Sequence, residues 1–231
     1  MLVSHRKQFI FTKTVKTAGT SVESYFEPYC VPEGTWTESH ARDEQVSDAG
    51  IVGYRGSNPA GATWVNHMPA ERIRELLGEP TWNRYFKFTI IRNPFDKMVS
   101  GFFRYEHQLQ HRHGAGTGAA SGDTGDAAAL VARFRAWLAS AGPIVDRNKY
   151  VIDGEECVDD YIRFESLHEG IARVCARLAI AFEPARIPEF KKGIRHHAVP
   201  VRDYYDAATE RIVRDAYEWE LRRFGYDMPE G

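Results

Sequence analysis

Short apolar runs alternate along this chain with longer segments in which apolar positions recur every three or four residues. The runs Phe9–Phe11 and Tyr85–Ile91 are apolar enough to predict strands buried on both faces of a sheet. Weaker runs predict further strands at Ala62–Val65, Lys149–Ile152 and Tyr161–Phe164. Helical spacing predicts helices from Gly19 to near Pro28 and at Ala70–Leu77, Pro94–His111, Leu130–Leu138, Ser166–Leu178 and Asp206–Phe224. This alternation predicts one α/β domain over residues 1–231, with a mostly parallel central sheet flanked by helices.

Two stretches lack any sustained periodicity. Residues Cys30–Gly61 are rich in Gly, Pro, Ser and acidic residues, and we expect them to be irregular. Residues His113–Ala129 are almost all small, so they offer little side-chain surface to offset the entropy lost on ordering. A mobile insert is expected there.

Composition restricts the class of protein. With 231 residues, 43% hydrophobic and 27% charged, the chain is that of an ordinary globular protein. A formal net charge of −2 gives no electrostatic basis for nucleic-acid binding. Three scattered cysteines, Cys30, Cys157 and Cys175, predict neither a disulfide framework nor a zinc site. The absence of a long apolar run and of a signal-peptide pattern predicts no transmembrane segment and a cytoplasmic location.

A polar turn follows the first buried strand and carries the most distinctive chemistry. In Lys16-Thr17-Ala18-Gly19-Thr20-Ser21 the glycine permits close approach of a ligand to the backbone, and a helix is predicted to begin there. Exposed N–H groups, the positive end of a helix dipole and a lysine suit a phosphate or sulfate. The alternative is that Thr20 or Ser21 caps the helix and Lys16 is solvated.

Two further polar positions follow predicted strands. His67 lies between a predicted strand and a helix, and Arg92 directly follows Tyr85–Ile91. Arg92 can grip a phosphate with its planar guanidinium, and Ser100, two turns into the next helix, can direct its hydroxyl to the same anion. The alternatives are a salt bridge from Arg92 to Asp96 and a packing role for Ser100.

These segments together resemble a known family. KTAGTS after a strand, His67 before a helix, IIRNPFDKMVSGFF, IRFESL and the closing RDYYD…IVRDAYEWELRRFGY are similar to carbohydrate sulfotransferases that use 3′-phosphoadenosine-5′-phosphosulfate (PAPS). The similarity is greatest to the branch of heparan and chondroitin sulfotransferases and their bacterial relatives. It implies a single P-loop-like domain, PAPS as the sulfonyl donor, no metal, and a carbohydrate or glycolipid acceptor.

The resemblance also implies roles for particular residues. Lys16, Thr17, Ala18, Gly19, Thr20 and Ser21 would bind the 5′-phosphosulfate, Arg92 and Ser100 the 3′-phosphate, and His67 would take the proton of the acceptor hydroxyl. Two positions depart from the family pattern. Val15 stands where proline is usual before the motif lysine, and Lys13 stands where histidine is frequent.

The chemistry suits these residue types without the resemblance. Sulfonyl transfer needs an aligned hydroxyl, a base, and positive charge beside the departing oxygen, which Lys16 and backbone N–H groups can supply. A histidine base contributes ~10²–10⁴ in rate. His196 and His197 are alternatives to His67. They lie in the cationic segment 191–197, whose Lys192 and Arg195 are predicted to close over the nucleotide unless the segment is only a solvated turn.

Two other functions remain open on the sequence. A nucleotide-dependent kinase would need G-x-x-x-x-G-K-[ST], whereas here Lys16 precedes Gly19 and Thr20 follows it. A non-catalytic module that binds a phosphorylated or sulfated nucleotide would keep the same anion site. The acceptor, the position sulfated and the oligomeric state are not predicted.

Overall fold

The protein is seen in a computed structural model that describes residues 1–56, 58–112, 127–188 and 199–230. The chain divides into two compact units. One unit contains Met1–Ile91 with Asp146–Phe190 and carries the sheet, and the other contains Arg92–Val145 with Lys191–Gly231 and is helical.

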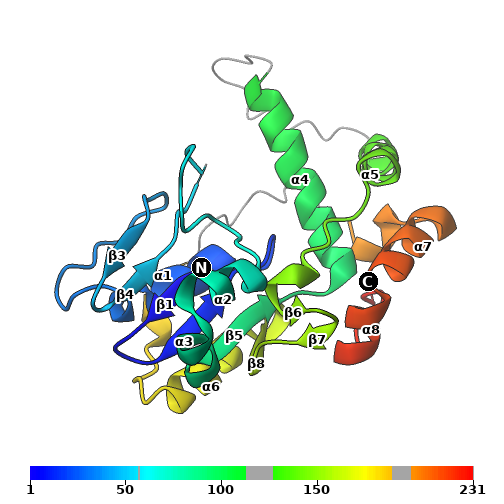
Figure 1. The fold of residues 1–231 in the computed structure, drawn as a ribbon. Helices are drawn as coiled ribbons and strands as arrows, with labels where there is room; N and C mark the ends of the chain where they lie inside the picture. The colour runs from blue at the N-terminus through cyan, green and yellow to red at the C-terminus, as the bar shows by residue number, and fades with distance from the viewer. Residues whose placement is uncertain (57, 113–126, 189–198, 231) are drawn as a thin grey trace. The chain divides into compact units, whose positions relative to one another are not determined.

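The central sheet has six strands in the order β3-β4-β1-β2-β5-β8 (Figure 1). The strands are β1 (Leu2–Ser4), β2 (Phe9–Thr12), β3 (Gln45–Ser47), β4 (Gly50–Val52), β5 (Phe86–Ile91) and β8 (Asp160–Arg163). β2, β5 and β8 are parallel, whereas β1 is antiparallel to β2 and β4, and β3 is antiparallel to β4. The α/β class is confirmed. The sheet is mixed: β2, β5 and β8 form its parallel part, and β1, β3 and β4 form its antiparallel part.

Alternating residues of the strands face two separate hydrophobic cores. Phe9, Phe11 and Phe88 pack with α1 (Gly19–Phe26) and α6 (Leu167–Arg177) on one face. Val3 and Ile10 face the other side. That side is covered by α2 (Ala70–Leu77), α3 (Glu79–Arg84) and the buried Trp64. The sheet is therefore covered on both faces, as the continuous apolar runs predicted.

A small hairpin, β6 (Val151–Ile152) and β7 (Glu155–Glu156), lies outside the main sheet. Its turn is Asp153-Gly154, and both residues have positive φ, 53° and 86°. This is the backbone conformation that an Asp-Gly hairpin turn favours.

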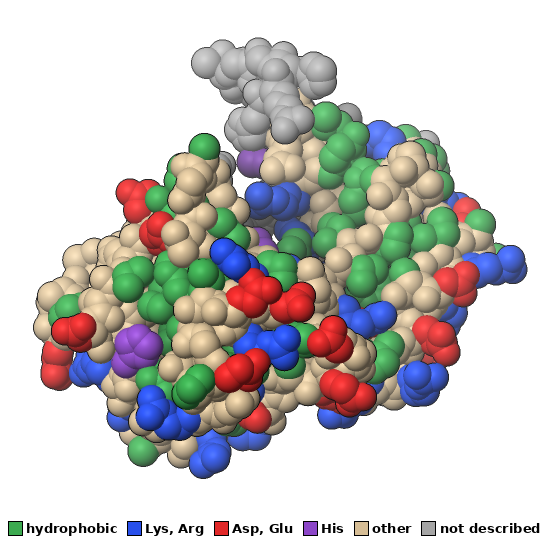
Figure 2. Space-filling model, in the orientation of Figure 1, with side chains coloured by type: hydrophobic (Ala, Val, Ile, Leu, Met, Phe, Trp, Pro, Cys, Tyr) green, Lys and Arg blue, Asp and Glu red, His purple; other side chains and the backbone are tan. Residues whose placement is uncertain are grey.

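The helical unit contains α4 (Pro94–Arg112), α5 (Ala127–Ala141), α7 (Ala207–Ala216) and α8 (Glu218–Phe224). Aromatic rings fill its core, where Phe134 meets Phe102, Tyr204 and Tyr205 at centroid distances of 5.6, 5.4 and 5.0 Å. Asp206 caps α7, because its carboxylate accepts the Thr209 N–H at 2.9 Å. Figure 2 shows acidic and basic side chains interspersed over one face of the molecule, consistent with the net charge near zero.

Several predictions about elements were wrong. No strand forms at Ala62–Val65, because the Trp64 N–H donates to the Glu44 carboxylate at 2.6 Å and the Trp64 carbonyl accepts from Tyr54. The stretch Cys30–Gly61 is not wholly irregular, since it contains β3 and β4, whose three-residue length left no periodic signal.

Two helix boundaries also differ from the prediction. The last helix is divided at Tyr217, which is buried and donates its hydroxyl to the Ile144 carbonyl. The helix α5 begins at Ala127, so residues 127–129 of the predicted insert are helical, and residues 113–126 lie outside the described part of the chain. Among the described helices, none combines the length and apolarity that crossing a bilayer requires.

Candidate active site

The loop between β2 and α1 has an unusual backbone. Lys16 and Ala18 have φ of 63° and 61°, in the left-handed region that costs energy for residues other than glycine. Ala18 is the N-cap of α1 and makes no side-chain cap, while its carbonyl accepts the Ser21 N–H at 2.9 Å. Neither Thr20 nor Ser21 occupies the N-cap, so the capping alternative does not describe this turn. The positive end of the helix dipole remains available to an anion.

Hydrogen bonds to acceptors in distant parts of the chain restrain this loop. The Val15 N–H donates to the Asp146 carboxylate at 2.6 Å, and the Thr14 hydroxyl donates to the Ile90 carbonyl in β5. The hydroxyls of Thr14 and Thr17 lie 2.8 Å apart, and both residues are buried. These hydrogen bonds restrain the loop, and a restrained loop loses less conformational entropy when it binds a ligand.

Gly19 is required by the close approach of Lys13. A Cβ at Gly19 would lie 2.9 Å from Lys13 Cγ and 3.3 Å from the Thr14 carbonyl oxygen. The aliphatic part of Lys13 thus packs directly against the first turn of α1, and its ammonium donates to Glu23 Oε2 at 2.6 Å. Lys13 is 3% exposed, so this ion pair is buried.

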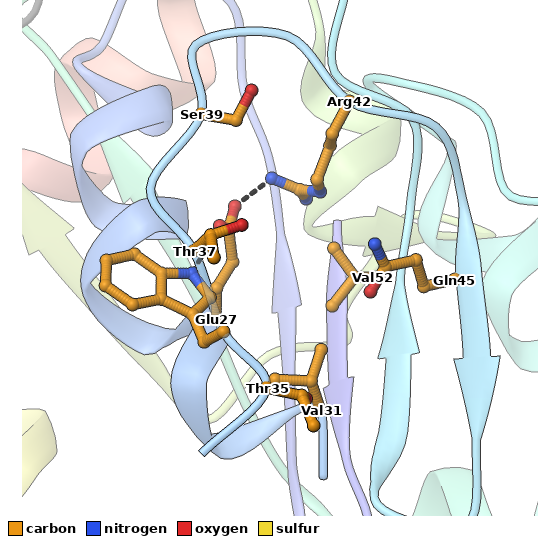
Figure 3. Close-up of a pocket in the computed structure, with 9 residues that line it drawn as sticks. Glu27, Val31, Thr35, Thr37, Ser39, Arg42, Gln45 and Val52 are labelled. Carbon is orange, nitrogen blue, oxygen red and sulfur yellow. Dashed lines mark hydrogen bonds and ion pairs between the residues drawn. The ribbon is translucent and has the colours of Figure 1, made fainter. Parts of the chain in front are cut away.

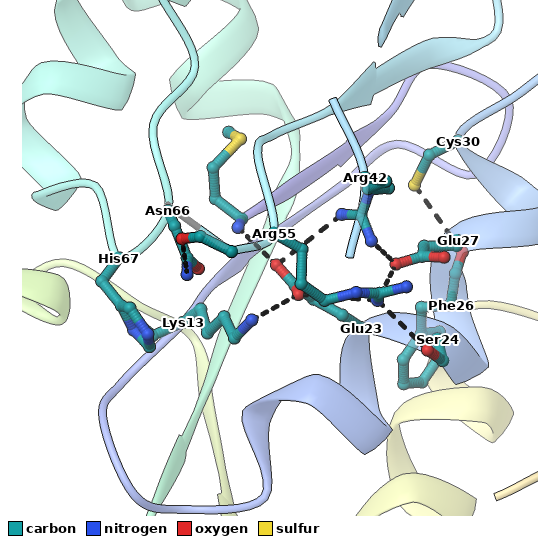
Figure 4. Close-up of polar contacts among 12 residues, drawn as sticks. Lys13, Glu23, Ser24, Phe26, Glu27, Cys30, Arg42, Arg55, Asn66 and His67 are labelled. Atoms are coloured by element: carbon teal, nitrogen blue, oxygen red, sulfur yellow. Dashed lines mark hydrogen bonds and ion pairs between the residues drawn. The ribbon is translucent and has the colours of Figure 1, made fainter. Parts of the chain in front are cut away.

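A buried ion network extends from Lys13 to the far end of α1 (Figure 4). Glu23 Oε1 also accepts from the α-amino group of Met1 at 2.6 Å, and Glu27 pairs with Arg42 and Arg55. Burial alone would raise the pKa of Glu23, but the charges of Lys13, the α-amino group and Arg42 outweigh burial and hold that pKa well below its usual range. Glu23 is therefore a carboxylate at neutral pH.

His67 lies against the same loop. Its Nδ1 is 3.1 Å from the carbonyl oxygen of Lys13, and its φ of 55° is again in the left-handed region. Burial, together with the nearby positive charge of Lys13, lowers the pKa of His67 to about 4. The ring is therefore neutral at pH 7. Because a carbonyl can only accept, Nδ1 carries the proton, and the lone pair lies on Nε2.

The structure brings some of the predicted site residues together. The loop and first turn of α1 hold Lys16, Thr17, Ala18, Gly19, Thr20 and Ser21. Their neighbour His67 contacts the start of that loop. Arg92 directly follows β5 and belongs to the helical unit, as does the half-buried Ser100 on α4. Lys192, Arg195, His196 and His197 lie outside the described residues.

Arg92 forms the salt bridge that the sequence offered as an alternative. Its Nε and Nη2 lie 2.8 and 2.6 Å from Asp96 Oδ2. The side chain of Arg92 is 12% exposed. This ion pair fixes the guanidinium at the start of α4, and its role in binding a phosphate stays a prediction.

Sequence reasoning missed three residues that shape the site. Lys13 was noted only as a departure from a pattern, although its carbonyl orients His67. Glu23 lies on the helix after the loop and is buried. The sequence signal for it was an acidic residue at a position of that helix that faces the core. Asp146 is 131 residues from Val15 in sequence, and no local pattern connects the two.

Within the described ranges, no three His, Cys, Asp or Glu side chains gather closely enough to hold a metal ion. The sequence-based expectation of a metal-free site stays a prediction.

A sequence model of the sulfotransferase family matches residues 1–227, which include both units. The chain belongs to the sulfotransferase family. No curated protein and no solved structure gives a significant match. Membership confirms the resemblance at the level of the family and identifies the chain as a sulfonyl transferase, with an α/β fold consistent with that family. The branch within the family stays a prediction.

Proposed function

We propose that this sulfotransferase moves a sulfonyl group from PAPS to a hydroxyl of a carbohydrate or glycolipid by in-line displacement. The observation that carries this proposal is the position of His67, a neutral imidazole bonded through Nδ1 to the loop that bears Lys16. A base beside an anion-binding turn is the arrangement that transfer to a hydroxyl requires.

The loop Lys13–Ala18 supplies the donor end of the site. Backbone N–H groups at the start of α1 and the ammonium of Lys16 would contact the phosphosulfate. As the sulfonyl group leaves, negative charge develops on the oxygen that stays with the nucleotide, and Lys16 would stabilise that charge. The hydrogen bonds that the loop donates to Asp146 and Ile90 support this role, because they hold the loop in one conformation.

His67 would supply the acceptor side of the chemistry. Its Nε2 lone pair can take the hydroxyl proton while the oxygen attacks sulfur. With a pKa of about 4 the free ring is a weak base. A bound anionic donor adds negative charge near the ring and Lys13, which raises the pKa of His67 and strengthens the base.

The 3′-phosphate of the donor is assigned to Arg92 and Ser100, with Lys192 and Arg195 closing over the nucleotide. The chain position of Arg92 supports this assignment. Arg92 directly follows β5, and the parallel neighbour of β5 is β2, which leads into the anion-binding loop. The proposal requires the two units to act as one sulfotransferase domain.

A binding and turnover experiment tests the proposal. Adenosine 3′,5′-bisphosphate should raise the melting temperature more than adenosine 5′-phosphate does. Radiolabelled PAPS should transfer sulfate to a carbohydrate acceptor, and His67→Gln should bind the bisphosphate normally while turnover falls ~10²–10⁴-fold. The matched control is His168→Gln, on the exposed surface of α6. Full activity of His67→Gln would remove the base from the mechanism.

The alternatives give different outcomes in the same experiment. A non-catalytic module would bind the bisphosphate and turn over no donor with any acceptor. A kinase would transfer phosphate from a nucleoside triphosphate.

The three cysteines are free thiols in the structure. The cytoplasmic location stays a prediction.

A further inference from the structure

His67 belongs to a short run of chain between two buried residues. These are Trp64 and Met68, which are 7% and 1% exposed and pack in the core that α2 covers. The three residues between them, Val65, Asn66 and His67, are half-buried. The position of the imidazole therefore depends on how this run is held at its two ends.

The backbone of the run is strained at His67. Its φ of 55° lies in the left-handed region, which costs energy for residues other than glycine. Relaxation of this φ would move the ring relative to the Lys13 carbonyl, which lies 3.1 Å from Nδ1 (Figure 4). The end at Met68 is held because that side chain is buried and α2 begins at Ala70. The end at Trp64 needs an anchor in the backbone as well.

Glu44 supplies this second anchor. Its Oε2 accepts the Trp64 N–H at 2.6 Å, and its Oε1 accepts the Thr63 N–H at 3.4 Å. The Trp64 carbonyl accepts the Tyr54 N–H at 2.8 Å. A hydrogen bond to a carboxylate is roughly twice as strong as one between neutral groups, so the bond to Glu44 is the stronger of the two restraints on the Trp64 backbone.

The segment that carries Glu44 is itself held in place. Arg42 exchanges two backbone hydrogen bonds with Arg55, at 2.9 and 3.0 Å. The side chain of Arg42 points toward Glu27 at the end of α1 and donates to that carboxylate (Figure 3). Glu44 follows Arg42 by two residues and directly precedes β3. It therefore belongs to a framework that is tied to the same helix that begins at the anion-binding turn.

We propose that Glu44 is a positioning residue for His67, which keeps the imidazole at the Lys13 carbonyl by holding the backbone of Trp64. The charged groups that act on the pKa of His67 are the Lys13 ammonium, the α-amino group and Glu23, so Glu44 acts through the backbone. The role of the ring as a base rests on the proposed function, whereas the placement of the ring does not.

The titration of His67 and the turnover rate test this role together. Glu44→Ala removes the acceptor of the Trp64 N–H. We expect the midpoint of the His67 ring C–H signals to rise from near 4 by about one pH unit or more, because a ring that leaves its buried position is hydrated. The kcat should fall about ten- to a hundredfold, as a small misplacement of a catalytic group does. The KM for PAPS and the affinity for adenosine 3′,5′-bisphosphate should stay unchanged, since the loop of Lys16 is untouched.

Two variants separate positioning from a loss of charge. Glu44→Gln should restore the midpoint and most of the kcat, because its amide oxygen still accepts an N–H. The matched control is Asp43→Ala, which removes the exposed acidic residue next in the chain and should leave both values unchanged. Urea unfolding shows whether each variant is folded. If Glu44→Ala is not, Glu44→Asp keeps the charge, shortens the reach of the carboxylate, and should raise the midpoint in the same direction.

The outcomes distinguish this role from the proposed function. An unchanged midpoint and kcat in Glu44→Ala, or equal changes in Glu44→Gln, would overturn the positioning role even if His67→Gln abolishes turnover. Full activity of His67→Gln would instead remove the base from the proposed function, and the midpoint in Glu44→Ala would still decide whether Glu44 positions the ring.

Discussion

Acidification gives the sharpest test of how His67 is held. Its pKa in the folded chain is about 4, against an ordinary value of 6.5. At pH 5 about nine-tenths of the His67 rings should therefore be neutral, whereas a histidine with the ordinary value would be about 3% neutral. The ring contacts the Lys13 carbonyl, and the charged groups that act on its pKa are the Lys13 ammonium, the α-amino group and Glu23.

The same pKa has a consequence for stability, with a definite sign. Between pH 6.5 and 4 the unfolded chain binds a proton at His67 that the folded chain does not, so stability falls as the pH falls through this window. Integrating the difference from neutral pH to pH 5 gives a loss of about 2 kcal/mol from this residue. The buried α-amino group also titrates nearby, with a pKa lowered to about 6. A variant at His67 is needed to separate the two.

Two measurements check this. The ring C–H signals of His67, assigned by their absence in His67→Gln, should titrate near pH 4 in the free protein, and adenosine 3′,5′-bisphosphate should raise the midpoint. Urea unfolding at pH 7.5 and pH 5 should show the extra loss of about 2 kcal/mol in the parent chain and not in His67→Gln. A midpoint near 6.5, or equal losses in both proteins, would refute the buried, carbonyl-bonded imidazole.

Three further substitutions test other parts of the site. Lys16→Ala should lower turnover at least ~10²-fold, as loss of a preorganised donor does, and near-normal sulfate transfer would remove Lys16 from the mechanism. Arg92→Ala should weaken binding of adenosine 3′,5′-bisphosphate far more than that of adenosine 5′-phosphate in calorimetric titrations, and equal losses would place Arg92 away from the 3′-phosphate. Glu23→Gln should destabilise the fold by about 3 kcal/mol or more, because Lys13 keeps its charge without a full partner, and Lys13→Met in the same chain should restore part of this loss in urea unfolding. Additive losses in that double variant would contradict the ion pair.

Patterns of short range predicted the helices and the parallel strands well. The runs at Phe9–Phe11 and Tyr85–Ile91 became β2 and β5, and proline at the first turn predicted the start of α4 at Pro94. The antiparallel strands β3 and β4 were missed because three residues are too few for alternation to be recognised. Their pairing depends on contacts with β1 at the start of the chain, which local sequence does not encode.

The residues of the site likewise divide into those that local sequence predicts and those that depend on long-range contacts. The turn Lys16–Ser21 was visible as a motif after a buried strand, since a strand, a glycine and hydroxyl residues are adjacent in sequence. His67 was predicted to follow a strand at Ala62–Val65, and no strand forms there. His67 nevertheless lies beside the loop, where its ring contacts the Lys13 carbonyl. Asp146 and Glu23 act through buried hydrogen bonds and ion pairs, and only the fold brings these to the loop.

The structure suggests a physical reason why Val15 can replace the proline that is usual before the motif lysine. Proline is usual before the motif lysine, and it restrains a loop by fixing its own φ, but it has no N–H to donate. In this chain Val15 has an N–H, and that group donates to the buried carboxylate of Asp146 at 2.6 Å. A hydrogen bond to a distant acid thus restrains the loop where a proline ring would do so locally.

Nucleotide binding can test whether the Val15–Asp146 hydrogen bond restrains the loop as a proline would. Asp146→Ala should weaken bisphosphate binding about tenfold, because a hydrogen bond to a charged acceptor is lost and the loop must be ordered on binding. Val15→Pro added to Asp146→Ala should recover about two- to fivefold of that affinity by restricting the unbound loop. Val15→Pro alone should weaken binding, since it leaves Asp146 without this donor. If the proline gives the same change in affinity with and without Asp146, the two residues do not act on one loop, and the hydrogen bond does not replace the ring.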